Sequence, residues 1–206
     1  MKFETMTLFH QTPETNLLPF DGRLTYFPHF LDLEKNRIYF ETFLHTIEWK
    51  QDEAILYGKH ITTKRSVAWY ADKGFSYRYS GTTKTALAWS KELLNLKEEV
   101  EQETKEIYNS CLLNLYHDGS EGMAWHSDDE TSLKKNSSIA SVSLGAERIF
   151  RFKHKKKNTV IELSLEPGSL LLMQGEIQHH WLHSLPKALK VKQPRINLTF
   201  RQFGTM

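Results

Sequence analysis

The chain has 206 residues, which is the size of one domain with a substantial hydrophobic core. Hydrophobic residues make up 39% and charged residues 25%, as is usual for soluble globular proteins. The sequence has no apolar run near the roughly 20 residues that a membrane span needs, and its first residues do not resemble a secretion signal. We therefore expect a soluble intracellular protein.

The cysteine content bears on the cellular compartment of the protein, and the distribution of charge bears on whether it binds nucleic acid. The formal net charge is only +2, and Cys111 is the single cysteine, so no intrachain disulfide can form and a reducing compartment is favoured. Basic residues cluster at Lys153, His154, Lys155, Lys156 and Lys157, with others at Lys187, Lys190 and Lys192. Such a cluster can neutralise nucleic-acid phosphates, although a solvated hairpin loop is the favoured interpretation of the run by itself.

The first half of the chain predicts two helices. Apolar residues recur near helical spacing over 31–47, and a second helix is predicted over 85–107. No internal repeat or flexible linker divides the sequence, so we expect a single domain over 1–206.

After Tyr108 the pattern changes to short β-like segments separated by polar turns. Glu166-Pro167-Gly168 is one such turn. The expected fold class is α+β and β-rich, with helices packed on a largely antiparallel sandwich, barrel or jelly roll. The predicted strands are 111–116, 139–144, 149–153, 159–165, 169–173 and 196–200.

A candidate metal site lies in the motif that contains His126 and Asp128. Residues two apart on an extended strand project from the same face, so an imidazole and a carboxylate can reach one ion. A second histidine would come from His179, His180 or His183. Two histidines and one carboxylate leave open coordination positions, as ferrous oxygenases require. A His-x-Asp tripeptide by itself is more often a surface turn.

The segment 194–201 alternates without a break and reads as a strand. Ile196, Leu198 and Phe200 would face one way, and Arg195 and Arg201 the other, together with Asn197 and Thr199. Inward arginines need acidic partners, so this face predicts a pocket for a dicarboxylate, which arginine binds in bidentate fashion. A half-exposed edge strand is the alternative.

These motifs together resemble the AlkB family of Fe(II)- and 2-oxoglutarate-dependent nucleic-acid dealkylases, especially its animal DNA-repair members and their bacterial relatives. The resemblance runs from about Leu56 to Arg201 and includes Tyr77–Gly81, Asn114–Tyr116, His126–Glu130, His183–Pro186 and Arg195–Arg201. It implies a double-stranded β-helix (jelly-roll) core over 107–206, flanking helices in an N-terminal extension over 1–50, and a nucleotide-recognition region over 51–106.

The resemblance also assigns ligands. Iron(II) would be bound by His126, Asp128 and His183, where His183 is preferred because it opens the His-Ser-Leu-Pro stretch. Arg195 and Arg201 would bind the carboxylates of 2-oxoglutarate, and O₂ would complete the set of cosubstrates. The hydrogen-bonding residues around them would be Asn114, Tyr116, Asn197 and Thr199.

On the substrate side, the family flips a damaged base out of the stack, so the base needs an aromatic face and polar edge contacts. Tyr79 matches the aromatic that stacks on this base. Asp129 and Glu130 could face its edge, which is cationic in N-methylated adenine and cytosine. The other matching positions are Tyr57, Gly58, Lys59, Arg65, Tyr77, Arg78 and Ser80. Of these, Tyr57 corresponds to a finger residue that fills the gap in the duplex.

The expected function is oxidative repair of N-alkylated bases, such as 1-methyladenine and 3-methylcytosine, in DNA. RNA or another substrate of the same enzyme class, and a non-catalytic binding module, are the alternatives. The basic loop 153–157 is shorter than in duplex-repairing relatives, which leaves open whether single- or double-stranded DNA is preferred. We further expect a monomer with no membrane partner, cytoplasmic in a bacterium and nuclear in a eukaryote.

Overall fold

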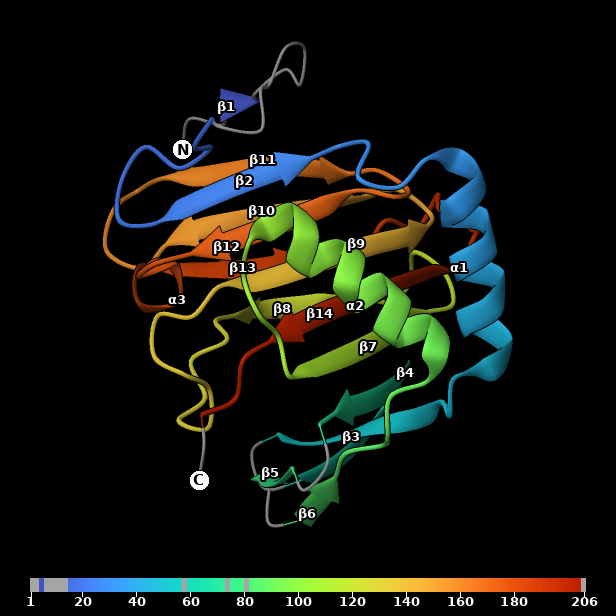
Figure 1. Cartoon of the computed structure of the whole chain (residues 1–206). Helices are drawn as coiled ribbons and strands as arrows, with labels where there is room; N and C mark the ends of the chain where they lie inside the picture. The colour runs from blue at the N-terminus through green and yellow to red at the C-terminus, as the bar shows by residue number, and fades with distance from the viewer. Residues whose placement is uncertain (1–3, 6–14, 57–58, 73–74, 80–81, 205–206) are drawn as a thin grey trace.

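A computed structural model describes residues 4–5, 15–56, 59–72, 75–79 and 82–204, with the backbone alone for 4–5, 52–56, 59–62, 76–79 and 82–84. The strands of these residues form two large sheets and a small hairpin, and two longer helices lie on the outside (Figure 1). No helix in this described part is long and apolar enough to cross a membrane.

The larger sheet has seven strands, and all its neighbouring strands pair antiparallel. β14 lies at its centre, hydrogen-bonded to β9 and β7. In spatial order the strands are β2 (Arg23–Phe27), β12 (Leu170–Gln174), β9 (Ile139–Gly145), β14 (Arg195–Arg201), β7 (Ser110–Tyr116), β4 (Lys59–Ala71) and β3 (Lys50–Leu56).

The smaller sheet has five strands and packs against the larger one. Its spatial order is β1 (Glu4–Thr5), β11 (Val160–Leu165), β10 (Arg148–His154), β13 (Trp181–Leu185) and β8 (Met123–His126). Only β1 joins it in parallel. The separate hairpin consists of β5 (Ser76–Tyr79) and β6 (Thr82–Thr85), at the end of the molecule next to β3 and β4 (Figure 1).

The helices begin at side-chain caps. In α1 (Leu33–Thr46), Asp32 Oδ1 accepts a hydrogen bond from Lys35 N at 2.7 Å, and Ser90 caps α2 (Lys91–Thr104) in the same way. α2 runs across the outer face of the larger sheet, while α1 lies at one end of it (Figure 1). A third, short helix, α3 (Ile177–His180), leads into β13.

Two apolar clusters hold these layers together. The first joins both long helices to the outer face of the larger sheet and contains Phe43, Leu96, Ile196, Leu198 and Phe200, each fully buried. The second lies between the sheets, where Leu171 of β12 meets Phe152 and Trp181 of the smaller sheet. Two packed, largely antiparallel sheets fit the expected jelly roll.

The six predicted strands correspond to β7, β9, β10, β11, β12 and β14 within one residue at each end. The expected turn is present, since Ser169 N donates to Glu166 O and Gly168 has φ +79°. The pattern did not predict β1 to β6 or β13, and of β8 it predicted only an extended strand at His126.

The second predicted helix is correct only in part. It begins at Lys91 rather than at residue 85, because Leu87 is held in an extended segment by backbone hydrogen bonds to Trp69 and Ala71. It ends at Thr104, because Lys105 adopts φ +59° and breaks the helical repeat. Leu87 and Trp89 pack on the first apolar cluster from this extended segment, which apolar spacing alone does not distinguish from a helix face.

Candidate metal centre

Two histidines face each other across adjacent strands of the smaller sheet. His126 at the end of β8 pairs in register with His183 on β13. Their Nε2 atoms lie 3.1 Å apart, and their ring centroids 4.2 Å apart. Cross-strand pairing therefore brings together two residues that are 57 positions apart in the sequence.

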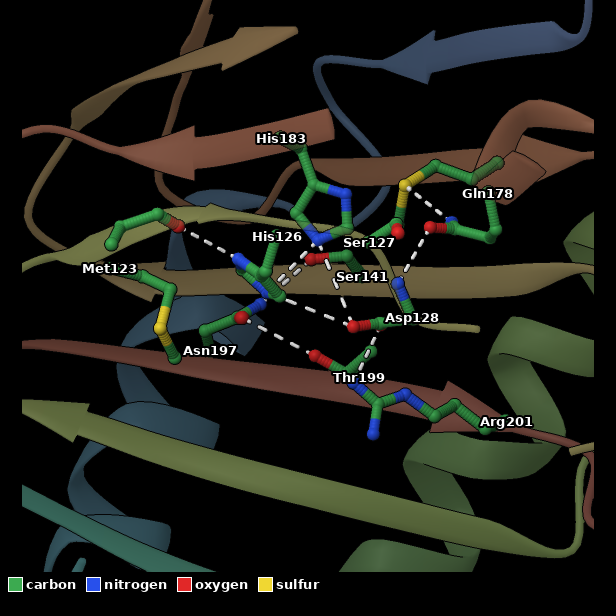
Figure 2. Close-up of polar contacts among 12 residues, drawn as sticks. Met123, His126, Ser127, Asp128, Ser141, Gln178, His183, Asn197, Thr199 and Arg201 are labelled. Carbon is green, nitrogen blue, oxygen red and sulfur yellow. Dashed lines mark hydrogen bonds and ion pairs between the residues drawn. The ribbon is translucent and has the colours of Figure 1, made fainter. Parts of the chain in front are cut away.

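Asp128 supplies a carboxylate at the same point. Its Oδ1 lies 3.7 Å from His126 Nε2 and 3.8 Å from His183 Nε2 (Figure 2). β8 ends at His126, so Asp128 lies in the segment that follows the strand and not, as predicted, on it. The three side chains converge nevertheless, with one ligand atom from each within 4.8 Å of the others.

The protonation states of the histidines suit metal binding. His126 Nδ1 lies 2.9 Å from the carbonyl of Ala124, which can only accept, so Nδ1 carries the proton and Nε2 keeps its lone pair. Burial lowers the pKa of His183 to about 4, although the carboxylate of Asp128 opposes the shift. His183 is therefore a neutral ligand near neutral pH, and the hydrogen bond at His126 Nδ1 turns Nε2 of that ring toward the site.

Arg201 holds the carboxylate in place. Its Nη2 donates to Asp128 Oδ2 at 2.6 Å, which leaves Oδ1 directed at the two histidines. Burial of Asp128, which is 6% exposed, acts to raise its pKa, but Arg201 and the histidines together hold that pKa below its usual value. The group is thus an anionic ligand with a fixed orientation.

The polar face of β14 lines the space between the sheets. Ile196, Leu198 and Phe200 face the helices, while the alternate residues face the candidate metal centre, as the sequence predicted. Asn197 Nδ2 donates to Ser141 Oγ at 2.8 Å, and Thr199 Oγ1 donates to Asn197 Oδ1 at 3.4 Å (Figure 2).

Arg195, at the start of this strand, is buried without a carboxylate partner among the described residues. It is 2% exposed, its Nη2 donates to Ser143 Oγ at 2.9 Å, and its Nε has no hydrogen-bond partner within the same part of the chain. Burial lowers its pKa to about 10, so the guanidinium stays charged. A buried charge of this kind is costly unless an anion joins it.

Asn114 and Tyr116 of β7 lie beside Arg195. Tyr116 pairs in register with Arg195, and its ring centroid lies 5.7 Å from the guanidinium carbon. Two more arginines approach the same ring, Arg148 at 5.9 Å and Arg65 at 6.0 Å. Asn114, 5% exposed, has no partner for its Oδ1 within the described residues. Tyr116 is thus surrounded by three arginines, and the neighbouring strand positions of β7 and β14 carry the other predicted cosubstrate residues.

The predicted substrate residues are only partly described. Arg65 is half-buried on β4, and its Nη1 lies 3.4 Å from Met123 Sδ. Asp129 and Glu130 are exposed and line a cavity of about 270 Å³ that also borders Asp128. Lys59 lies on β4 and Tyr77, Arg78 and Tyr79 on β5, with their backbones alone described. Tyr57, Gly58 and Ser80 fall outside the described residues.

The other histidines of the 179–183 segment point elsewhere. His179 Nε2 contacts Asn136 Oδ1 at 3.0 Å, and His180 Nε2 lies 3.5 Å from Glu176. His183 is therefore the histidine that meets His126, in agreement with the prediction.

Several residues of the site were not predicted from the sequence. Ser141 and Ser143 receive hydrogen bonds from β14, Gln178 Oε1 accepts from Asp128 N at 2.9 Å, and Arg148 binds the carbonyls of Glu121 and Pro186. The serines alternate with Ala140, Val142 and Leu144, which is a detectable signal of a polar strand face. Gln178 and Arg148 carry no comparable sequence signal.

The donor set fits a ferrous ion. Two imidazole nitrogens and one carboxylate oxygen occupy one side of an ion and leave the remaining positions for other ligands. Arg201 binds the other oxygen of the Asp128 carboxylate, and Arg195 on the same strand is a buried cation without a carboxylate partner among the described residues, which suits an added dicarboxylate. The arrangement can therefore hold an ion and an anionic cosubstrate together.

Comparison with known proteins points to the same class of enzyme. The sequence matches the 2OG-Fe(II) oxygenase superfamily over residues 23–201. It is 36% identical over 189 residues to the bovine (Bos taurus) "Alpha-ketoglutarate-dependent dioxygenase alkB homolog 3", covering 87% of this chain and 66% of the relative. It is 42% identical over 118 residues to the human (Homo sapiens) "DNA oxidative demethylase ALKBH2", covering 53% of this chain and 45% of the relative.

A solved structure, "The structure of OsALKBH1", shares the fold with a TM-score of 0.57 and 17% identity, over 87% of this chain and 96% of that chain. The chain spans 66% of the bovine relative and 45% of the human one. Members of the superfamily use Fe(II), 2-oxoglutarate and O₂, and this chain presents His126, Asp128 and His183 for the iron. The resemblance drawn from the motifs is thereby confirmed: the chain belongs to the 2OG-Fe(II) oxygenase superfamily, as a member of its AlkB family.

Proposed function

We propose that this protein is an Fe(II)- and 2-oxoglutarate-dependent dioxygenase that removes N-alkyl groups from nucleic-acid bases, with DNA as the favoured substrate. The observation that carries the proposal is Arg195, buried with no carboxylate partner among the described residues, on the same face of β14 as Arg201, which binds the metal-site residue Asp128. A metal-binding triad and an unbalanced buried cation joined by one strand suit a dicarboxylate that reaches both.

The residues of the chain divide the work of binding. His126, Asp128 and His183 would hold the iron from one side, and Arg201 keeps the Asp128 carboxylate turned toward it. Arg195, supported by Ser143 and Tyr116, would bind the far carboxylate of 2-oxoglutarate. This binding fixes the cosubstrate's orientation and fills the pocket, so that water is excluded from it.

The bound iron and 2-oxoglutarate would supply the oxidising power, with O₂ consumed and succinate and CO₂ formed. Hydroxylation of an N-alkyl carbon on a base then releases that carbon as formaldehyde and restores the base. The exposed carboxylates of Asp129 and Glu130 lie next to the metal ligand Asp128, where they can attract a cationic N-methylated base.

The choice of DNA is supported by the relatives and not by the described side chains. The human relative is named a DNA oxidative demethylase, and the bovine one an alkB homolog 3 dioxygenase. RNA is the second candidate substrate, because a basic run such as 153–157 would neutralise the phosphates of either polymer.

Succinate and formaldehyde release should be measured with single-stranded DNA, duplex DNA and RNA, each carrying 1-methyladenine or 3-methylcytosine. We expect turnover with methylated DNA and none with the unmethylated strands. Turnover with RNA alone would replace the proposed substrate. Absence of a charge-transfer absorption band on anaerobic addition of Fe(II) and 2-oxoglutarate would refute the oxygenase proposal itself and leave a binding module.

A further inference from the structure

One lysine of the basic run turns back toward the candidate metal centre. Lys155 follows directly after β10, and its Nζ donates to Gln178 O at 2.9 Å and to Ser127 Oγ at 3.1 Å. The same Nζ lies 3.9 Å from Asp129 Oδ2, and the side chain is 29% exposed. An ammonium group has three hydrogens to donate, and three acceptors surround this one.

Gln178 links Lys155 to the candidate metal ligand Asp128. Its side-chain Oε1 accepts from Asp128 N at 2.9 Å (Figure 2), and its Nε2 lies 3.6 Å from Met173 Sδ on β12. Lys155 binds the backbone of Gln178, and Gln178 binds the backbone of Asp128. The two residues thus form a continuous brace from the β10–β11 hairpin, through α3, to the ligand loop 127–129.

The ligand loop needs such support, because strand pairing does not provide it. β8 ends at His126, so the backbone of Asp128 is not held by a neighbouring strand of the smaller sheet. Arg201 fixes Oδ2 of the carboxylate, but a single bond at the tip does not fix the backbone behind it. The brace holds the backbone N–H of Asp128 and, on either side of it, the Ser127 hydroxyl and the Asp129 carboxylate.

We propose that Lys155 and Gln178 are positioning residues that hold the ligand loop so that Asp128 Oδ1 stays directed at the metal ion. The inference rests on the proposed function only in taking His126, Asp128 and His183 as the metal site. It gives Lys155 a role other than phosphate contact, although it belongs to the basic run. Partners of this kind around a metal ligand typically change metal affinity by about 10- to 100-fold when they are removed.

The test is anaerobic titration of the whole chain with Fe(II) at saturating 2-oxoglutarate, read by the charge-transfer absorption band. Lys155→Met removes the ammonium at similar length, and Gln178→Met removes the acceptor for Asp128 N. We expect each variant to raise the half-saturating Fe(II) concentration by about 10-fold, while the melting temperature of the metal-free protein stays near that of the wild type. Gln178→Glu keeps the acceptor oxygen and should restore part of the affinity.

Lys156→Met is the matched control, since Lys156 is a neighbouring exposed lysine whose backbone N–H donates to His154 Nδ1. This variant should leave the iron titration unchanged. Wild-type iron affinity in both Lys155→Met and Gln178→Met would overturn the inference, and it would leave the proposed function intact as long as the wild type shows the band.

Binding of a methylated single-stranded oligonucleotide to the metal-free protein, measured over a range of salt concentrations, separates the two roles of Lys155. A positioning residue leaves the salt dependence of Lys155→Met unchanged. A fall of about 0.7 in the slope of log affinity against log salt, with unchanged iron affinity, would make Lys155 a phosphate contact instead.

Discussion

Within the part of the chain that the structure describes, two clusters are built from the same residue types, and their hydrogen bonds differ in a way that favours metal binding in one of the two. His126, Asp128 and His183 form the candidate metal centre. Asp21, His154 and His180 form a second cluster, at the hairpin after β10, and its ligand atoms are also within 4.8 Å of one another. Residue type and proximity therefore do not distinguish the two.

Hydrogen bonds behind the ligand atoms do distinguish them. His154 Nδ1 accepts from the backbone N–H groups of Lys156 and Lys157 at 3.1 and 2.8 Å, so the proton is on Nε2, which donates it to Asp21 Oδ2 at 3.1 Å. Lys157 Nζ lies 2.8 Å from the same oxygen. The lone pair of His154 Nδ1 is therefore already used, its Nε2 carries a proton, and Lys157 supplies positive charge to the Asp21 carboxylate.

In the candidate metal centre, the His126 proton lies on Nδ1, the ring nitrogen that faces away from the other two ligands. His126 gives its Nδ1 proton to a backbone carbonyl, and Arg201 occupies the carboxylate oxygen that faces away from the histidines. One nitrogen and one carboxylate oxygen are thereby left pointing at the same position. The comparison shows that the partner of the non-ligating atom decides whether a histidine–aspartate cluster serves as a ligand set or as a structural contact.

Removing one carboxylate from each cluster tests whether the first cluster binds iron and the second does not, and it should give the largest effect. Asp128→Ala should abolish iron binding and lower turnover by more than about 100-fold, because a direct ligand is lost and Arg201 loses its partner. Asp21→Ala should leave the iron titration and succinate release at wild-type values. Succinate production by Asp128→Ala at the wild-type rate would show that the metal is bound elsewhere.

Replacing Arg195 tests whether its guanidinium binds a carboxylate of 2-oxoglutarate. We expect Arg195→Met to raise the half-saturating 2-oxoglutarate concentration by roughly 100-fold, because an arginine–carboxylate pair in a buried pocket is lost. The melting temperature of the ligand-free variant should not fall, since no carboxylate among the described residues loses a partner.

Arg201→Met is the matched comparison for Arg195→Met. It leaves the buried carboxylate of Asp128 without its arginine and should lower the melting temperature. A lower melting temperature for Arg195→Met, together with unchanged 2-oxoglutarate affinity, would make Arg195 a structural residue.

Local patterns in the sequence predict which side chains of a strand face the site, but they do not predict which distant segments meet there. The alternation over Arg195–Arg201 fixes which side chains face the site, because strand geometry is local, and the structure agrees. The pairing of His126 with His183 followed only from the resemblance, since it depends on how β8 and β13 meet. Gln178 and Lys155 were missed because their bonds to the ligand loop join segments 50 and 28 residues apart. Contacts of this kind have no periodic signal.

His154→Ala should affect stability and not metal binding. His154 is 2% exposed, packs edge-on against Phe20 and Trp181 and organises the hairpin backbone, so we expect its loss to cost about 2–3 kcal/mol of unfolding free energy. Urea denaturation measures this loss, and the iron titration serves as the control. A weakened iron affinity in this variant would mean that the two clusters are coupled through the hairpin that also carries Lys155.

Lys157→Met should change stability less than His154→Ala. Lys157 lies 3.5 Å from the centroid of the Phe20 ring and pairs with an exposed carboxylate, and such surface contacts are largely screened by water and salt. We expect a melting temperature within about 2 °C of the wild type. His154 would still donate to Asp21 in this variant, so the second cluster should remain closed to metal. If Lys157→Met acquired a second, weaker site in a Zn²⁺ titration, the lysine rather than the histidine proton would be what excludes metal from this cluster.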